Sequence, residues 1–94
     1  MLIRSQDKKH LINLDNVTEI FTYRNMPKDR AILPEYETEI ICFTGRNEIS
    51  IGIYSSEEKA IRVLDMIENR YLDHCCNYHA QSGVFQMPQD YEID

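Results

Sequence analysis

The chain has 94 residues, 43% of them hydrophobic, which suits one small domain because each separate core needs roughly 50 or more residues. Its formal net charge is -6, and the negative excess lies in residues 47–94, where nine Asp or Glu accompany three Lys or Arg. That half would repel a phosphate backbone, so direct binding of DNA or RNA is disfavoured, and the cations left for it are Arg4, Lys8, Lys9, Arg24, Lys28 and Arg30.

The N-terminal residues MLIRSQDKK carry several charges and no apolar run behind them, which is not the pattern of a signal peptide. No segment approaches the roughly 18 apolar residues that a membrane helix needs. The cysteines are three in number, and two of them are adjacent, so we expect reduced thiols and no structural disulfide. These features predict a soluble cytoplasmic protein that does not bind membranes.

The first part of the chain is typical of short strands. Leu2 and Ile3 predict a first strand, and a polar turn follows. Residues 10–24 are rich in β-branched and aromatic side chains and predict one or two strands, with a break near Asp15 and Asn16. Residues 25–34 contain two prolines and lose the alternation, so we expect a loop there.

Residues 36–54 predict a hairpin that turns at TGRN, where Gly45 can adopt the positive φ of a tight turn. In the second arm the alternation places Ile49, Ile51 and Ile53 on one face, which we expect to be buried in the core. In the first arm both faces are apolar, with Ile40 and Cys42 on one and Ile41 and Phe43 on the other. The helix could cover one of these faces, and a second sheet layer or a partner the other.

The segment SSEEKAIRVLDMI marks the change from strand to helix. Ser55 and Glu58 have the spacing of a capping box, so the helix should begin at about Ser56 and end between Tyr71 and Cys76. Its predicted buried stripe consists of Ala60, Leu64, Ile67 and Tyr71, widened by Ile61 and Val63.

After the helix, Gly83 predicts a break and residues 84–87 a short extended segment, while the acidic tail from Pro88 should fray. We therefore predict a single domain over residues 1–94, with antiparallel strands in 1–54, a helix in 55–76 and a C-terminal segment in 77–94. The expected fold class is α+β, with about five strands in one bent antiparallel sheet packed by one amphipathic helix. Parallel crossovers are not expected, since they would need more than one helix.

Three segments, IRSQDKK, GIYSSEEKAIRVLDMI and GVFQMP, resemble in this order a group of small uncharacterised bacterial proteins often encoded among phage-related or mobile-element genes. The strand and capped helix also resemble the end of the pleckstrin-homology-like fold, a bent antiparallel sheet plugged by a C-terminal helix. The resemblance covers about two thirds of the chain and departs from the group in RNMPKDRAILPEYETE and YLDHCCNYHAQS. It implies a fold but no activity.

The segment DHCCNYH holds the candidate metal ligands Cys75, Cys76 and His79. Cys75 and His79 would share one side of a continuing helix and could bind a transition metal, either alone or shared across a dimer. The alternative is a helix end with buried thiols and exposed histidines, and it is favoured because a zinc site usually draws a second ligand pair from another segment. Cys42 and His10 are isolated here.

Catalytic signals are weak throughout the sequence. A cysteine nucleophile at the C-terminal end of a helix is disfavoured because the helix dipole raises the thiol pKa there. The chain has no glycine-rich phosphate loop, nucleophile elbow or HExxH motif. We therefore expect neither catalytic residues nor a cofactor.

Surface recognition remains as the expected role. Six tyrosines are many for this length, and tyrosine is enriched at protein interfaces. The sequence predicts a non-enzymatic protein-interaction or regulatory module whose partner is unknown. An origin in a phage or mobile element and assembly as a homodimer are both left open. One alternative is a metal-binding protein, and another is an acidic protein that blocks a nucleic-acid-binding partner.

Overall fold

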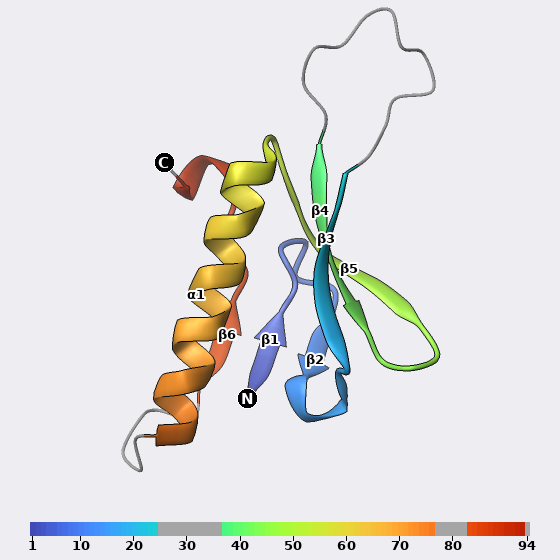
Figure 1. Cartoon of the computed structure of the whole chain (residues 1–94), viewed down its shortest axis with the longest axis vertical. Helices are drawn as coiled ribbons and strands as arrows, with labels where there is room; N and C mark the ends of the chain where they lie inside the picture. The colour runs from blue at the N-terminus through green and yellow to red at the C-terminus, as the bar shows by residue number, and fades with distance from the viewer. Residues whose placement is uncertain (25–36, 77–82, 94) are drawn as a thin grey trace, which may run out of the picture.

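The structure, a computed structural model, describes residues 1–24, 37–76 and 83–93, with the backbone alone for 74–76. The described part is an α+β fold with one long helix, as predicted, and short 3-10 turns η1 (Leu14–Asn16) and η2 (Asp90–Glu92) (Figure 1). Its strands and helix are β1 (Leu2–Arg4), β2 (Leu11–Asn13), β3 (Glu19–Arg24), β4 (Thr38–Phe43), β5 (Glu48–Tyr54), α1 (Glu57–Cys76) and β6 (Val84–Gln86).

The six described strands form two sheets, where the sequence predicts one sheet of about five. The strand orders are β2-β1-β6 and β3-β4-β5. The predicted break near Asp15 and Asn16 is confirmed, because η1 separates β2 from β3 and allows the chain to pass from one sheet to the other. Instead of bending within one sheet, the chain therefore leaves the first sheet at η1 and enters the second.

The expectation of antiparallel pairing throughout is wrong for the first sheet. β1 pairs antiparallel with β2 but parallel with β6, in a register that sets Ile3 opposite Phe85. No second helix is needed, since the whole intervening chain, α1 included, connects β1 to β6. The pairing of β1 with β6 could not be predicted from neighbouring segments, because the two strands are distant in sequence.

The predicted hairpin is confirmed as β4 and β5, and Gly45 has a φ of 91° in its turn. The face assigned to β5 is wrong, however, because Ile40 opposes Gly52 whereas Ile41 opposes Ser50, which leaves Ile51 as a bulge. A bulge reverses the alternation beyond it. Ile53 is accordingly 41% exposed, while Gly52 and Tyr54 are buried with Ile51, and Ile49 is half-buried.

Helix α1 begins one residue later than the predicted capping box requires. The Ser56 hydroxyl accepts the Lys59 N–H at 3.2 Å, and the Ser56 carbonyl accepts the Ala60 N–H, so Ser56 is the N-cap. Ser55 instead donates its backbone N–H to Asp90 Oδ1 at 2.8 Å. The helical end at Cys76 lies within the predicted range.

The helix packs over the core that the two sheets share. Ala60, Val63 and Ile67 are buried and Leu64 is half-buried, whereas Ile61 and Tyr71 are 46% and 42% exposed, so the predicted stripe was too wide. Both faces of β4 are largely buried, as expected. The core cluster comprises Ile3, Ile12, Ile40, Cys42, Ile51, Tyr54, Ala60, Val63, Ile67, Phe85, Met87 and Ile93.

The C-terminal residues are docked, which contradicts the expected frayed tail. Tyr54 donates its hydroxyl to the Pro88 carbonyl at 2.8 Å, and Ile93 is 8% exposed. Lys59 Nζ lies 3.5 Å from Asp90 Oδ2. Apolar burial and these polar contacts together hold η2 against β5 and the start of α1.

No helix within residues 1–24, 37–76 and 83–93 is long and apolar enough to cross a membrane.

Candidate functional site

The segments that carry the sequence resemblance meet at Gln6. Its side-chain amide accepts the Ile53 N–H at 2.9 Å and donates to the Ile53 carbonyl at 3.1 Å and to the Pro88 carbonyl at 3.2 Å. The Gln6 backbone N–H donates to Ile51, and its carbonyl accepts from Gln89. Gln6 thus joins both sheets to the C-terminal segment, and these residues stabilise the fold.

The turn after β1 is held by its own side chains. Ser5 donates its hydroxyl to Asp7 Oδ1 at 2.6 Å and accepts the His10 N–H at 3.0 Å. The Ser5 hydroxyl, followed by the Lys9 N–H, lowers the pKa of the Asp7 carboxyl from its ordinary value. Lys8 has a φ of 67° and its side chain donates to Gln86, so Lys8 contributes to the geometry of this turn.

The predicted metal ligands lie at the limit of the described residues. The backbone of Cys75 and Cys76 is helical, their side chains are not described, and His79 lies outside the described residues. Lys28 and Arg30 also lie outside them. Side chains described in the structure form no group of three or more metal-ligating residues.

Cys42 is a buried free thiol on β4. Burial raises its pKa to about 11, so the thiol is protonated at neutral pH and a poor nucleophile. Cys42 therefore belongs to the core and offers no catalytic group. His10, the other isolated residue considered as a ligand, is exposed on the turn after β1.

A groove of about 410 Å³ lies between the C-terminal half of α1 and the segment that joins β2 to β3. Most of its lining residues have apolar side chains, and several of these are half-buried against the core. It is large enough to admit a few side chains of a ligand. The lining residues are Leu14, Val17, Thr18, Glu19, Ile20, Leu64, Ile67, Glu68 and Tyr71.

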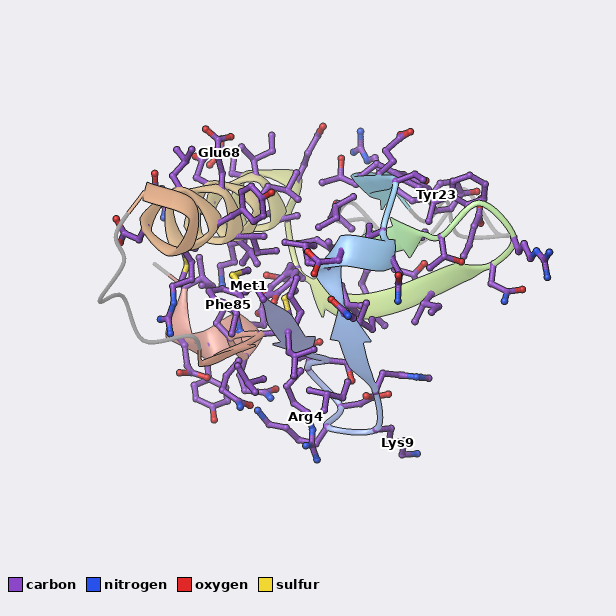
Figure 2. The ribbon with its side chains drawn as sticks, turned by 90° about the horizontal axis from the view of Figure 1, so that it is seen from below. Met1, Arg4, Lys9, Tyr23, Glu68 and Phe85 are labelled. Carbon is purple, nitrogen blue, oxygen red and sulfur yellow. The ribbon has the colours of Figure 1, made fainter. Side chains whose placement is uncertain are left out.

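Among the described residues of the lining, Glu19 and Glu68 are the charged ones, one on each wall. Both are exposed, and neither forms an ion pair with another described residue. Figure 2 shows Glu68 on the same side of the molecule as Tyr23 of β3. The groove therefore combines an apolar floor with an acidic rim.

The apolar surface of the groove continues along the helix. Ile61 and Leu72 are 46% and 50% exposed, and they lie three or four residues from Leu64 and Glu68, hence on the same side of α1. Ile61, expected in the core from its spacing, is exposed beside the groove, which was not predicted from the sequence. The available signal was an apolar stripe wider than one buried face needs.

The tyrosines differ in their roles. Tyr54 is buried, and its pKa is raised by burial and, to a lesser extent, by Asp90 and Glu92. Tyr23, Tyr71 and Tyr91 are exposed, while residues 36 and 78 lie outside the described residues. Tyr71 lines the groove, so among the described tyrosines it is the one placed to contact a ligand there.

Comparisons of the chain with protein-family models, curated protein sequences and solved structures find no match.

Proposed function

We propose that this protein is a non-enzymatic interaction module that binds a segment of a partner protein in the groove between α1 and β3. The observation that carries the proposal is an apolar groove that continues into exposed apolar side chains on α1. Clustered apolar surface of this kind is typical of binding sites. A regulatory or accessory role in a phage or mobile element would suit such a module.

We further propose that the fold is a variant of the pleckstrin-homology-like arrangement. Support comes from α1, which packs against all three strands of the antiparallel sheet β3-β4-β5. The sheet β2-β1-β6, with its parallel pair, is a departure from that arrangement. A cytoplasmic location is part of the same proposal, and the free thiol of Cys42 agrees with a reducing compartment.

Site-specific photo-crosslinking in the native host tests the groove as the binding site. A photoreactive amino acid replaces Glu68, an exposed residue of the groove, and in a matched variant replaces Tyr91, which is 83% exposed outside the groove lining. We expect a discrete crosslinked protein from position 68 that is absent from position 91. Equal crosslinking at both positions, or none at 68, would contradict the proposal.

A second candidate function follows from the acidic surface of α1, which could occupy a basic nucleic-acid-binding site on a partner. Its exposed carboxylates are Glu57, Glu58, Asp65, Glu68 and Asp73. In this case the crosslinked partner should bind DNA, and this protein should displace the DNA less effectively as salt rises. Reversing Asp65 and Asp73 to lysine should weaken the displacement, and an effect unaltered by salt would refute this function.

A further inference from the structure

β3 has one open edge. In its sheet β3 is hydrogen-bonded to β4 alone among the described strands, because the order is β3-β4-β5. Every second residue of an edge strand presents its backbone N–H and C=O groups outward, where they can pair with a further strand. These groups can bind a partner only if the surface beside them is accessible.

The groove meets β3 at the start of the strand, where Glu19 and Ile20 line it. Glu19 and Ile20 are successive residues of β3, so their side chains point to opposite faces of the sheet. Both nevertheless line the same groove. A groove that touches residues of both faces borders the edge between them, so the open backbone at the start of β3 faces the groove, whose other wall is α1.

The charge of the groove selects the chemistry of its occupant. Glu19 on β3 and Glu68 on α1 face it, and none of the lining residues that the structure describes is cationic. A ligand with lysine or arginine side chains would supply the missing positive charge, while apolar side chains would cover Leu64 and Ile20. Complementary charges of this kind favour the correct partner and speed its encounter.

We propose that the groove binds an extended segment of a partner protein, which adds as a further strand to the edge of β3 and carries basic side chains among alternating apolar ones. This inference rests on the proposed function and specifies its ligand. An extended segment fits better than a helix because it satisfies the outward N–H and C=O groups of β3, whereas a helix satisfies its own. Period-two alternation would then direct one set of side chains to the apolar floor.

Selection from a library of random peptides about ten residues long, displayed against the full chain, tests the proposal without assuming a partner. We expect selected peptides rich in Lys or Arg alternating with Val, Ile or aromatic residues. A synthetic selected peptide should slow hydrogen exchange of alternate β3 amides by at least about tenfold. The same peptide with alternate backbone amides methylated should lose binding, because its side chains are kept but its pairing edge is blocked.

Matched variants test the acidic rim. Glu19→Gln and Glu68→Gln should each weaken binding of the selected peptide about two- to fivefold, and the double variant about tenfold. Glu48→Gln is the control, because Glu48 is also exposed and begins the strand at the other edge of the same sheet. The control should bind the peptide as the wild type does, and all four variants should keep the wild-type melting temperature.

The outcomes separate this inference from the proposed function. Peptides that bind the groove as helices and leave β3 amides unprotected would overturn strand addition while the interaction module stands. Binding unaffected by the Glu19 and Glu68 substitutions would overturn the proposal that the ligand carries basic side chains. If selection yields no groove-binding peptide and position 68 gives no crosslink in the host, both proposals fail.

Discussion

The side chain of Gln6 takes the place of a neighbouring strand beside Ile53 of β5. Its amide group makes the paired donor and acceptor contacts with Ile53 that a neighbouring strand would make, and its backbone N–H bonds the Ile51 carbonyl. The edge of β5 is therefore partly covered where the two sheets meet. Within the described part of the chain, this leaves β3 as the more accessible edge of its sheet, in agreement with the proposed binding site.

Gln6→Ala should lower the free energy of unfolding by about 2 kcal/mol, because it leaves the Ile53 N–H without its partner and removes a donor to Pro88. Urea denaturation followed by circular dichroism measures the change. The control is Gln86→Ala, since Gln86 is exposed and makes one side-chain contact, with Lys8. It should cost less than about 0.5 kcal/mol. Equal losses would show that Gln6 does not have the joining role described.

Gly52 is required for close packing. A Cβ at this position would lie 2.9 Å from Tyr54 Cε2 and 3.2 Å from Met87 Cε, and the Tyr54 ring is fixed by its hydrogen bond to Pro88. Gly52→Ala should therefore destabilise the protein by about 1–3 kcal/mol, measured as a shift of the thermal midpoint. Ser50→Ala, on the exposed side of the same strand, should change it by less than about 0.5 kcal/mol.

At the scale of single elements, the local signals in the sequence were sufficient to locate the strands and the helix. Glycine at the turn, alternating β-branched residues and the period of the helix are all contained in short windows, and the strands and helix they predict are found. The bulge at Ile51 was not predictable, because it depends on how β5 pairs with β4. The N-cap is Ser56 instead of the predicted Ser55, because Asp90, which is distant in sequence, accepts the Ser55 N–H.

The position of the N-cap leads to a prediction. Ser56→Ala should destabilise the protein by about 1 kcal/mol, because the Lys59 N–H loses its acceptor. Glu58→Gln, which removes the carboxylate of the box predicted from sequence, should cost no more than a few tenths of a kcal/mol. Chemical denaturation of the two variants distinguishes the caps, and a larger loss for Glu58→Gln would restore the capping box at Ser55.

At the scale of the whole molecule, the C-terminal segment connects the helix with both sheets. Gln89 donates to Gln6, Pro88 accepts from Tyr54, and Asp90 contacts Lys59. The sequence could not show this, because an acidic stretch after a proline is typical of an exposed tail. The groove was not predicted either, because its two walls come from segments that are distant in sequence, residues 14–20 and 64–71.

Ile93→Ala should lower the free energy of unfolding by about 2 kcal/mol or more, since Ile93 is 8% exposed and belongs to the core cluster. Tyr91→Ala is the matched control, because Tyr91 is 83% exposed two residues away. It should change the free energy by less than about 0.5 kcal/mol. Two near-zero changes would mean that the end of the chain does not support the core.

Asp90 makes the docking of this segment depend on pH. The Ser55 N–H, followed by the Ser55 side chain and Lys59, lowers the pKa of the Asp90 carboxyl below its ordinary value. Its contribution to stability is therefore present above the unfolded pKa of about 4 and is lost as pH falls through the lower folded value. Urea denaturation from about pH 6 to pH 2 should show a smaller loss of stability for Asp90→Asn than for the wild type. Identical pH dependence would contradict this role.

The parallel pairing of β1 with β6 has a consequence for the order of folding. Leu2 is synthesised well before its partner Val84, because the other strands and α1 lie between them in the sequence. A nascent chain that ends at Cys76 contains α1 but lacks one neighbour of β1, so Ile3 is left without Phe85 beside it. Closing so long a loop is slow compared with forming hairpins and helices. The first sheet should thus be completed only once residues 84–86 have been synthesised, after the hairpin of β4 and β5 has formed.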